Sequence, residues 1–207
     1  MTPLWIKICG LRTATAIEAA AAAGANALGF VFHEPSPRNL SLDVARELQR
    51  AVPPGIERVA VFLHPAQALV DAVLESVSPD WVQTDADDLV ELRLPPGQRV
   101  LPVFRGSGSM PAPWPARCLL ESARSGMGER ADWQVAAQWS QATQLVLAGG
   151  LDPVNVAEAV RAVRPFGVDV SSGVESGRGV KDATLIHEFI RAAREAQRAL
   201  SVEESRR

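Results

Sequence analysis

The sequence is poor in cysteine and carries no surplus of positive charge. Only Cys9 and Cys118 are present, too few for a disulfide framework, so we expect both to remain free thiols in a reducing cytoplasm. The formal net charge of −3 offers no basic surface to nucleic acid or to anionic lipid. These features predict a cytoplasmic protein that binds neither nucleic acid nor a membrane.

Long apolar runs are also missing. The longest lies around Ala19–Ala23 and is too short and too rich in alanine to span a bilayer. No basic segment followed by an apolar core opens the chain, so no signal peptide is expected. Of the 207 residues, 47% are hydrophobic and 22% charged, which is typical of one globular domain covering residues 1–207.

Short β-branched runs alternate along the chain with longer segments of helical period, which indicates βαβ units and a parallel sheet. The predicted strands are Leu4–Cys9, Ala27–Phe32, Arg58–Leu63, Asp80–Thr84, Arg99–Phe104, Arg117–Glu121, Gln144–Ala148 and Gly167–Val170. The predicted helices are Thr13–Ala23, Ser41–Val52, His64–Val77, Asp87–Leu94, Asp132–Gln141, Pro153–Arg164 and a last one from about Asp182 to about Leu200. Residues 201–207 are expected to form a frayed tail.

Eight strands, each followed by a crossover, predict an α/β fold: a single (β/α)8 TIM barrel. The crossover after the fifth strand, Arg105–Ala116, is short and rich in Gly, Ser, Pro and Trp, so we expect it to be degenerate. A doubly wound open sheet is the alternative. Such a sheet more often has a G-x-G-x-x-G turn after its first strand, and Cys9–Arg12 does not match that pattern.

The alternation of side chains along a strand predicts which of them face the barrel interior. Lys7 and Cys9 share the inward face of the first strand, Glu121 ends the sixth strand and Asp169 lies in the eighth. Cys9, Glu121 and Asp169 are therefore expected near the C-terminal ends of their strands, where barrel enzymes build their active sites.

Two glycine-rich loops near the C-terminus, Leu147–Leu151 and Ser171–Gly177, follow the seventh and eighth strands. Paired glycines allow the backbone to approach an anion and present its N–H groups. Barrels often bind a phosphate between these two loops, although each loop alone would also suit a tight strand–helix turn. The predicted phosphate-binding residues are Gly149, Gly150, Ser171, Ser172 and Gly173.

Several segments resemble the phosphoribosylanthranilate isomerase family of tryptophan biosynthesis, and they occur in the family's order over nearly the whole chain. The most specific are the opening Lys-Ile-Cys-Gly and the closing Gly-Val-Asp-Val-Ser-Ser-Gly-Val-Glu. The resembling segments are Lys7–Leu11, Gly29–Phe32, Ser36–Arg38, Val59–Phe62, Trp81–Gln83, Leu147–Pro153, Gly167–Gly177 and Gly179–Asp182.

The resemblance implies an Amadori rearrangement of a phosphosugar substrate without a cofactor. It implies that Cys9 is the general base and Glu121 the general acid. The implied substrate-binding side chains are Lys7, Arg38, Gln83 and Asp169, of which Asp169 would contact the bridging amine. A base must be ionised to act, so the pKa of Cys9 should fall below its ordinary value, and Lys7 on the same inward face is expected to lower it.

The chain differs from the family pattern at three positions. In the loop Ser125–Glu129, Glu129 replaces the lysine that ends the family's glycine-rich sequence. Glu121 stands where the family has an aspartate, which adds one methylene to the acid, and Asp85 replaces a histidine after the fourth strand. The alternative function is therefore a divergent phosphosugar-binding barrel with low activity or a shifted substrate.

Neighbouring phosphosugar enzymes fit less well. Related epimerases use inward histidines and a metal, and indole-glycerol-phosphate synthase needs several catalytic lysines, whereas this chain has only Lys7 and Lys181. The three histidines, His33, His64 and His187, lie outside any ligand spacing, so no metal site is expected. A monomer is the expected state, with a homodimer as the alternative.

Overall fold

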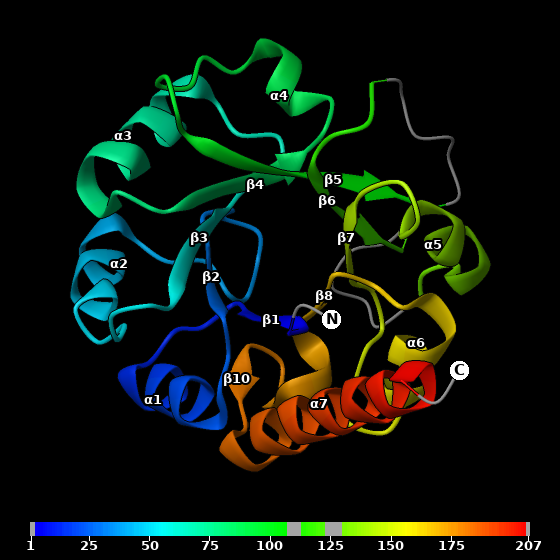
Figure 1. The fold of residues 1–207 in the computed structure, drawn as a ribbon. Helices are drawn as coiled ribbons and strands as arrows, with labels where there is room; N and C mark the ends of the chain where they lie inside the picture. The colour runs from blue at the N-terminus through cyan, green and yellow to red at the C-terminus, as the bar shows by residue number, and fades with distance from the viewer. Residues whose placement is uncertain (1–2, 107–112, 123–129, 206–207) are drawn as a thin grey trace.

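The computed structural model describes residues 3–106, 113–122 and 130–205. Eight parallel strands close into a barrel in chain order, and Figure 1 shows the helices arranged outside this ring. The strands are β1 Trp5–Cys9, β2 Ala27–Val31, β3 Glu57–Val61, β4 Trp81–Asp85, β5 Arg99–Arg105, β6 Arg117–Glu121, β7 Gln144–Leu147 and β8 Gly167–Val170. The helices are α1 Ala14–Ala23, α2 Leu42–Gln49, α3 Gln67–Val77, α4 Asp88–Glu91, α5 Trp133–Trp139, α6 Val156–Val163 and α7 Ala183–Ser205.

The barrel closes where β1 pairs with β8, with Lys7 opposite Asp169 in the register. This pairing confirms the predicted (β/α)8 barrel and rules out the open sheet. Between β5 and β6, the described residues contain no helix, as expected for a degenerate crossover; residues 107–112 of that crossover lie outside the described ranges.

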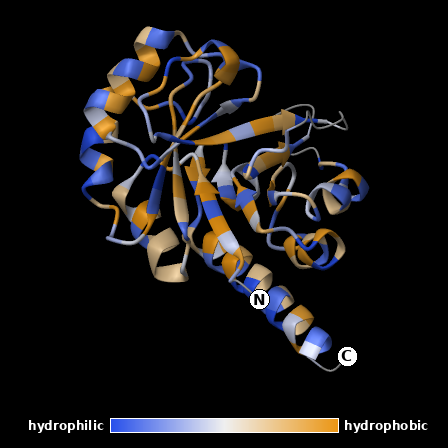
Figure 2. Cartoon of the chain, turned by 45° about the horizontal axis from the view of Figure 1, so that its top comes forward, coloured by the Kyte–Doolittle hydropathy of each residue, from blue (hydrophilic) through white to orange (hydrophobic). Residues whose placement is uncertain are grey.

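Alternating side chains divide the apolar residues into two cores. Residues of one parity, such as Ile6 and Ile8 in β1, pack between the strands and the helices. Those of the other parity, such as Trp5 in β1 and Leu119 in β6, form a smaller core inside the barrel. In Figure 2 the strands carry much of the apolar colour, while helices such as α7 show both apolar and polar stretches. The predicted parity of β1, β6 and β8 is confirmed.

The N-terminal end of the barrel is filled by aromatic and guanidinium groups. The Arg117 guanidinium lies 4.3 Å from the ring centre of Phe166 and 4.7 Å from that of Trp81. Arg99 stacks on Trp81 at 4.5 Å, and Trp5 stacks with Phe166. Such cation–π contacts stabilise packed rings, so these side chains contribute to the packing of this end of the barrel.

Helix ends follow the local sequence at α1. The Thr13 side chain accepts a hydrogen bond from the backbone N–H of Ala16, which satisfies one of the first free donors of the helix. Gly24 ends the helix at φ 94°, a left-handed conformation that glycine adopts without strain. The predicted helix Thr13–Ala23 is confirmed, with Thr13 as its N-cap.

Two helices, α3 and α6, begin three residues later than predicted, and α4 is shorter than predicted. Helix α3 begins at Gln67 rather than His64, because Asp88 accepts hydrogen bonds from the backbone and ring of His64 and holds this residue at φ 47°. Helix α6 begins at Val156 rather than Pro153, since the Asp152 carboxylate accepts the backbone N–H groups of the preceding turn. Helix α4 covers only Asp88–Glu91 of the helical stretch predicted there.

The C-terminal helix is longer than predicted. Helix α7 continues to Ser205, so residues 201–205 are helical and not a frayed tail. An ion pair of 2.7 Å between Arg164 and Glu204 ties this last turn to the end of α6. In Figure 2 the C-terminal part of α7 extends beyond the barrel. Among the described residues, no helix is both long and apolar enough to cross a membrane.

A short antiparallel hairpin after β8 was not predicted. It consists of β9 Glu175–Gly177 and β10 Val180–Lys181, and it follows a 3-10 turn at Ser172–Val174. Strands of three and two residues give too little periodic pattern to detect in a sequence. The hairpin nevertheless bears on the site, because Glu175 binds Arg38 and Lys181 donates to the Ser171 carbonyl.

Candidate active site

A cleft of about 250 Å³ opens at the C-terminal ends of the strands. Its lining includes four of the predicted site residues from four different strands: Cys9 of β1, Gln83 of β4, Glu121 of β6 and Asp169 of β8. Arg38, from the loop after β2, also lines it. The structure therefore brings together the predicted reaction centre and part of the predicted substrate site.

Cys9 lies beside a buried ion pair. The Lys7 Nζ donates to Asp169 Oδ1 at 2.8 Å, and the Lys7 side chain is fully buried. Although burial alone would lower the pKa of Lys7, the charges of Asp169 and Cys9 raise it. Lys7 is therefore a cation next to the thiol.

The expected low pKa of Cys9 is not found. Burial raises the pKa of the Cys9 thiol above its ordinary value, and the nearby Asp169 carboxylate adds to this. Lys7 acts in the predicted direction, and Lys181 assists, but both together do not outweigh the loss of hydration. The protein alone thus favours the neutral thiol.

Gly29 of β2 makes room for this cluster. A Cβ atom at this position would lie 2.9 Å from the Cys9 sulfur and 3.1 Å from the Lys7 Cε. Any larger residue at position 29 would therefore displace the Cys9 and Lys7 side chains on the adjacent strand. The sequence showed Gly29 within a motif but gave no indication of this role.

Arg38 is held by a bidentate ion pair. Its Nε and Nη2 donate to the two carboxylate oxygens of Glu175 at 2.7 and 2.8 Å, and both side chains are almost completely buried. Lys181 and the backbone N–H of Gly179 donate to Glu175 as well. Although burial alone would raise the pKa of Glu175, the hydrogen bonds from Arg38, Lys181 and Gly179 lower it to about 2. Gly10, at φ 77°, lies against the Arg38 side chain where a Cβ would clash. Glu175 thus aims the guanidinium into the cleft.

On another side of the cleft, Glu121 binds Arg105, a residue that the sequence did not predict for the site. Arg105 Nη1 donates to Glu121 Oε2 at 3.0 Å, and the opposite edge of the same guanidinium binds Asp85. The sequence placed Arg105 in the broken crossover, but β5 runs one residue further than predicted and includes it. Leu101 and Val103 face the barrel interior, so the next residue of the same parity, Arg105, could have been predicted to face it too.

The two glycine-rich loops meet at a small hollow of about 30 Å³. Gly149 and Gly150 both adopt positive φ, and the Asn155 side chain fixes their loop by donating to the Gly150 carbonyl at 2.8 Å. A Cβ on Gly173 would lie 1.9 Å from the Leu151 carbonyl oxygen, so the loops touch through this glycine. The predicted phosphate-binding residues Gly149, Gly150, Ser171 and Ser172 line the hollow.

The small hollow continues into the main cleft, because Glu121, Asp169 and Ser171 line both. Ser171 also bonds the Cys9 carbonyl through its hydroxyl at 3.2 Å and so links the β8 loop to β1. A ligand with an anion in the hollow would therefore extend past Asp169 toward Cys9 and Glu121.

Gln83 carries an unsatisfied group into this space. Gln83 is 5% exposed, and its Oε1 atom has no hydrogen-bond partner within the described part of the chain. A buried acceptor without a partner costs free energy. A bound ligand with an N–H or O–H group would satisfy it.

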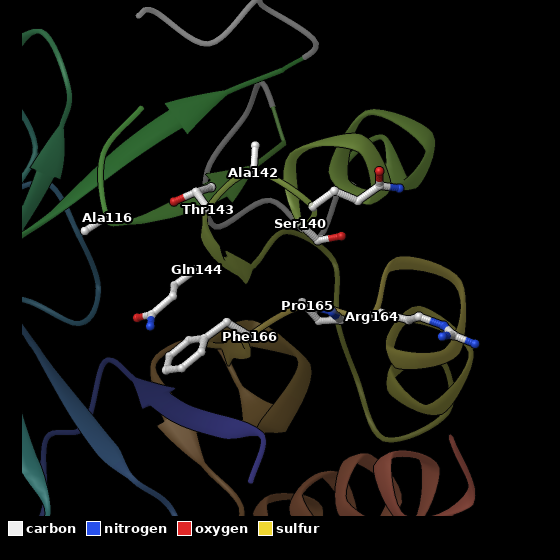
Figure 3. A pocket seen from close by; sticks show the side chains of 9 residues that line it. Ala116, Ser140, Ala142, Thr143, Gln144, Arg164, Pro165 and Phe166 are labelled. Carbon is white, nitrogen blue, oxygen red and sulfur yellow. The ribbon is translucent and has the colours of Figure 1, made fainter. Parts of the chain in front are cut away.

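A larger, open hollow of about 510 Å³ lies at the opposite end of the barrel. Figure 3 shows residues of its lining around the starts of β7 and β8, among them Gln144, Arg164 and Phe166. None of the predicted site residues lines it. Among the described residues, no cluster of His, Cys, Asp or Glu could hold a metal ion.

Comparison with known proteins decides the family. Residues 6–192 match the model of the family described as N-(5'phosphoribosyl)anthranilate (PRA) isomerase. The chain belongs to the PRA isomerase family. It is 39% identical over 202 residues to N-(5'-phosphoribosyl)anthranilate isomerase of Trichlorobacter lovleyi, with 92% of this chain and 98% of the relative covered. The corresponding enzyme of Thiobacillus denitrificans is 38% identical, with 91% and 97% covered.

Solved structures of PRA isomerases have the same fold. TrpF from Jonesia denitrificans superposes with a TM-score of 0.81 at 36% identity, covering 94% of this chain and 98% of that one. A PRA isomerase in complex with reduced 1-(o-carboxyphenylamino)-1-deoxyribulose 5-phosphate superposes with a TM-score of 0.74 at 28% identity, covering 93% and 99%.

Proposed function

We infer that the chain is an N-(5'-phosphoribosyl)anthranilate isomerase of tryptophan biosynthesis. It converts its substrate into 1-(2-carboxyphenylamino)-1-deoxyribulose 5-phosphate by an Amadori rearrangement. The observation that carries this conclusion is one continuous site in a member of the isomerase family: Cys9, Asp169 and Glu121 surround a cleft that runs into a glycine-rich hollow.

The hollow suits the phosphate of the substrate. Gly149 and Gly150 can turn backbone N–H groups toward an anion, and the hydroxyls of Ser171 and Ser172 add further donors. Gly173 keeps the two loops in contact. The phosphate would therefore anchor the sugar with its reacting carbons above the barrel axis.

The anthranilate end suits the other side of the cleft. Arg38 uses Nε and Nη2 for Glu175, so its remaining guanidinium edge is available to a substrate carboxylate. Phe62, Val31 and Pro37 line the same cleft and offer apolar contact to an aromatic ring. Gln83 Oε1 would accept a donor from the bound substrate.

The reaction needs two proton transfers. In the first, Glu121 donates a proton to the furanose ring oxygen, the ring C–O bond breaks, and an iminium forms at the nitrogen beside Asp169. In the second, the Cys9 thiolate removes the now acidic proton from the second sugar carbon, which gives an enolamine that tautomerises to the ketone. Lys7 stabilises the thiolate, and the Asp169 carboxylate stabilises the positive charge on nitrogen.

The test is the loss of phosphoribosylanthranilate fluorescence with time. We expect the wild type to turn over, and Cys9→Ser and Glu121→Gln each to reduce kcat by about 100-fold or more, as for other positioned acids and bases. Cys118→Ser is the matched control, because Cys118 is buried outside the barrel interior and burial raises its pKa to about 12. A wild type without activity would refute the function; full activity in Cys9→Ser or Glu121→Gln would refute that residue's role.

We further propose a monomer in a reducing cytoplasm, with a homodimer as the alternative. Both cysteines are free, which supports the location. Large apolar side chains that are exposed in the described residues belong to separate elements and loops rather than to one face. They are Val44, Leu69, Val90, Trp114, Val154, Val180 and Val202.

A further inference from the structure

Three charged side chains form a chain across neighbouring strands at the mouth of the cleft. Asp85 ends β4, Arg105 ends β5 and Glu121 ends β6. Arg105 lies opposite Glu121 in the strand register, so one guanidinium reaches both carboxylates.

The contacts are unequal on the two sides. Arg105 donates to Asp85 through Nε, at 3.0 Å to each oxygen, and through Nη2 at 2.7 Å. It donates to Glu121 through Nη1 alone, at 3.0 Å. Asp85 therefore fixes the plane of the guanidinium, and Glu121 receives a single directed hydrogen bond from it. A lysine has no such fork of fixed donors.

All three groups are shielded from water, with side-chain exposures of 15% for Asp85, 24% for Arg105 and 16% for Glu121. Although burial alone would lower the pKa of Arg105, its two carboxylate partners raise it. Arg105 is therefore a permanent cation, and its interactions are screened less than those of a surface pair.

A cation beside Glu121 has two opposite effects on a general acid. It orients the longer glutamate side chain, which helps because small misplacements of a catalytic group are costly. It also favours the carboxylate anion, which would deprive the acid of its proton. Asp85 offsets the second effect, because its negative charge lies directly on the same guanidinium.

We propose that Arg105 is a positioning residue for Glu121, and that Asp85 anchors Arg105 and balances its charge so that Glu121 can hold a proton. This inference rests on the proposed role of Glu121 as the acid. It also gives two of the three departures from the family pattern, Glu121 and Asp85, a common physical reason: both carboxylates bind one arginine. The third departure, Glu129, lies outside the described residues.

Other charged groups border this chain in the described structure. From the loop after β3, His64 Nε2 lies 3.9 Å from Asp85 Oδ2, and its other ring nitrogen bonds Asp88 of α4 at 2.8 Å. Hydrogen bonding to Asp88 raises the pKa of His64. Cys9 of β1 and Asp169 of β8 line the same cleft, and buried Lys7 pairs with Asp169. The other ionisable side chains that line it are His33, Arg38 and Arg178. Because none of these changes in the variants below, their influence is common to all of them.

The experiment records kcat and KM for phosphoribosylanthranilate from pH 5 to pH 10. Glu121→Asp is measured first. The limb of the kcat/KM profile that shifts in this variant is the one set by the ionisation of residue 121. Asp85→Asn removes the balancing charge, so this limb should shift to lower pH by about 0.5 unit or more. Arg105→Met removes the cation, so the limb should shift to higher pH, and kcat at the optimum should fall about 10-fold or more because Glu121 loses its orientation.

Two further variants keep the test sharp if Arg105→Met fails to fold. Arg105→Lys retains the charge but not the fork, so its limb should stay in place while kcat falls; full kcat would overturn the positioning role. Asp80→Asn is the matched control, because Asp80 precedes the same strand as Asp85 and pairs with Arg58 at the other end of the barrel. It should leave the limb unmoved.

The outcomes separate this inference from the function itself. An inactive wild type, or full activity in Glu121→Gln, would refute the proposed function or the acid. With an active wild type and a slow Glu121→Gln, an unmoved limb in both Asp85→Asn and Arg105→Met would overturn only the present inference. A raised KM in Arg105→Met at unchanged kcat would also overturn it, since Arg105 would then bind substrate directly.

Discussion

Cys9 depends on the balance of two opposite charges beside it. Lys7 lowers the pKa of the thiol, Asp169 raises it, and burial raises it further. Because Lys7 and Asp169 pair at 2.8 Å, removing either partner leaves the other charge unopposed next to the sulfur.

Substitutions of the two partners should therefore move the Cys9 titration in opposite directions. We expect Lys7→Met to raise the pH at which Cys9 becomes reactive and Asp169→Asn to lower it, each by about one unit. The measurement is the pH dependence of iodoacetamide alkylation in a Cys118→Ser background, with near-ultraviolet circular dichroism to verify the fold. Unchanged titration in both folded variants would contradict the charge balance.

For single residues, the sequence predicted which face of a strand a side chain lies on better than it predicted the pKa or the partners of that side chain. Strand parity correctly placed Lys7, Cys9, Glu121 and Asp169 on the inward face. It did not predict the raised pKa of Cys9, because the degree of burial depends on which side chains from other strands fill the space around the sulfur. It also missed Arg105, whose side chain becomes inward only because β5 continues one residue beyond the expected end.

At the scale of elements, the loops after β7 and β8 work as one unit. Gly173 is not in a left-handed conformation; its role is the close approach to the Leu151 carbonyl, where a Cβ would lie at 1.9 Å. A backbone oxygen cannot move aside as a flexible side chain can, so the loops would have to separate.

Gly173→Ala should therefore weaken the phosphate end of the site. We expect KM for phosphoribosylanthranilate to rise about 10-fold or more, and inorganic phosphate to inhibit less, with a loss of about 1–3 kcal/mol in the free energy of unfolding. Gly177→Ala is the matched control, because a Cβ there meets nothing within 4 Å. Equal KM in the two variants would contradict the contact between the loops.

Element boundaries were predictable where a local cap decides them and not where a distant residue does. Thr13 and Gly24 bound α1 through their own backbone and side-chain chemistry. The start of α3 depends instead on Asp88, which lies 24 positions beyond His64 and binds its backbone and ring. The added turn of α7 similarly depends on Arg164 of another helix.

At the scale of the whole molecule, Glu175 connects the loop after β2 with the hairpin after β8. It binds Arg38, 137 positions earlier in the sequence, as well as Lys181 in the hairpin after β8. This tie lies close to the seam where β1 pairs with β8, so it reinforces the closed barrel and the site together. The sequence could predict the closed topology from eight strand–helix units, but an ion pair between such distant residues needs the closed barrel to exist.

This tie should make stability depend on pH in a defined range. Partners lower the pKa of Glu175 from an ordinary value of 4.5 to about 2. The stabilisation is therefore complete above the unfolded pKa and is lost as the pH falls from about 4.5 through about 2. In urea unfolding, the wild type should exceed Glu175→Gln by roughly 1–2 kcal/mol at pH 7, after allowance for screening, and this difference should shrink steadily below pH 4.5. Glu195→Gln, which breaks only an exposed pair with Arg191, should cost little at any pH. A Glu175→Gln deficit that stayed constant from pH 7 to pH 3 would show that the carboxylate charge is not what stabilises the closed barrel.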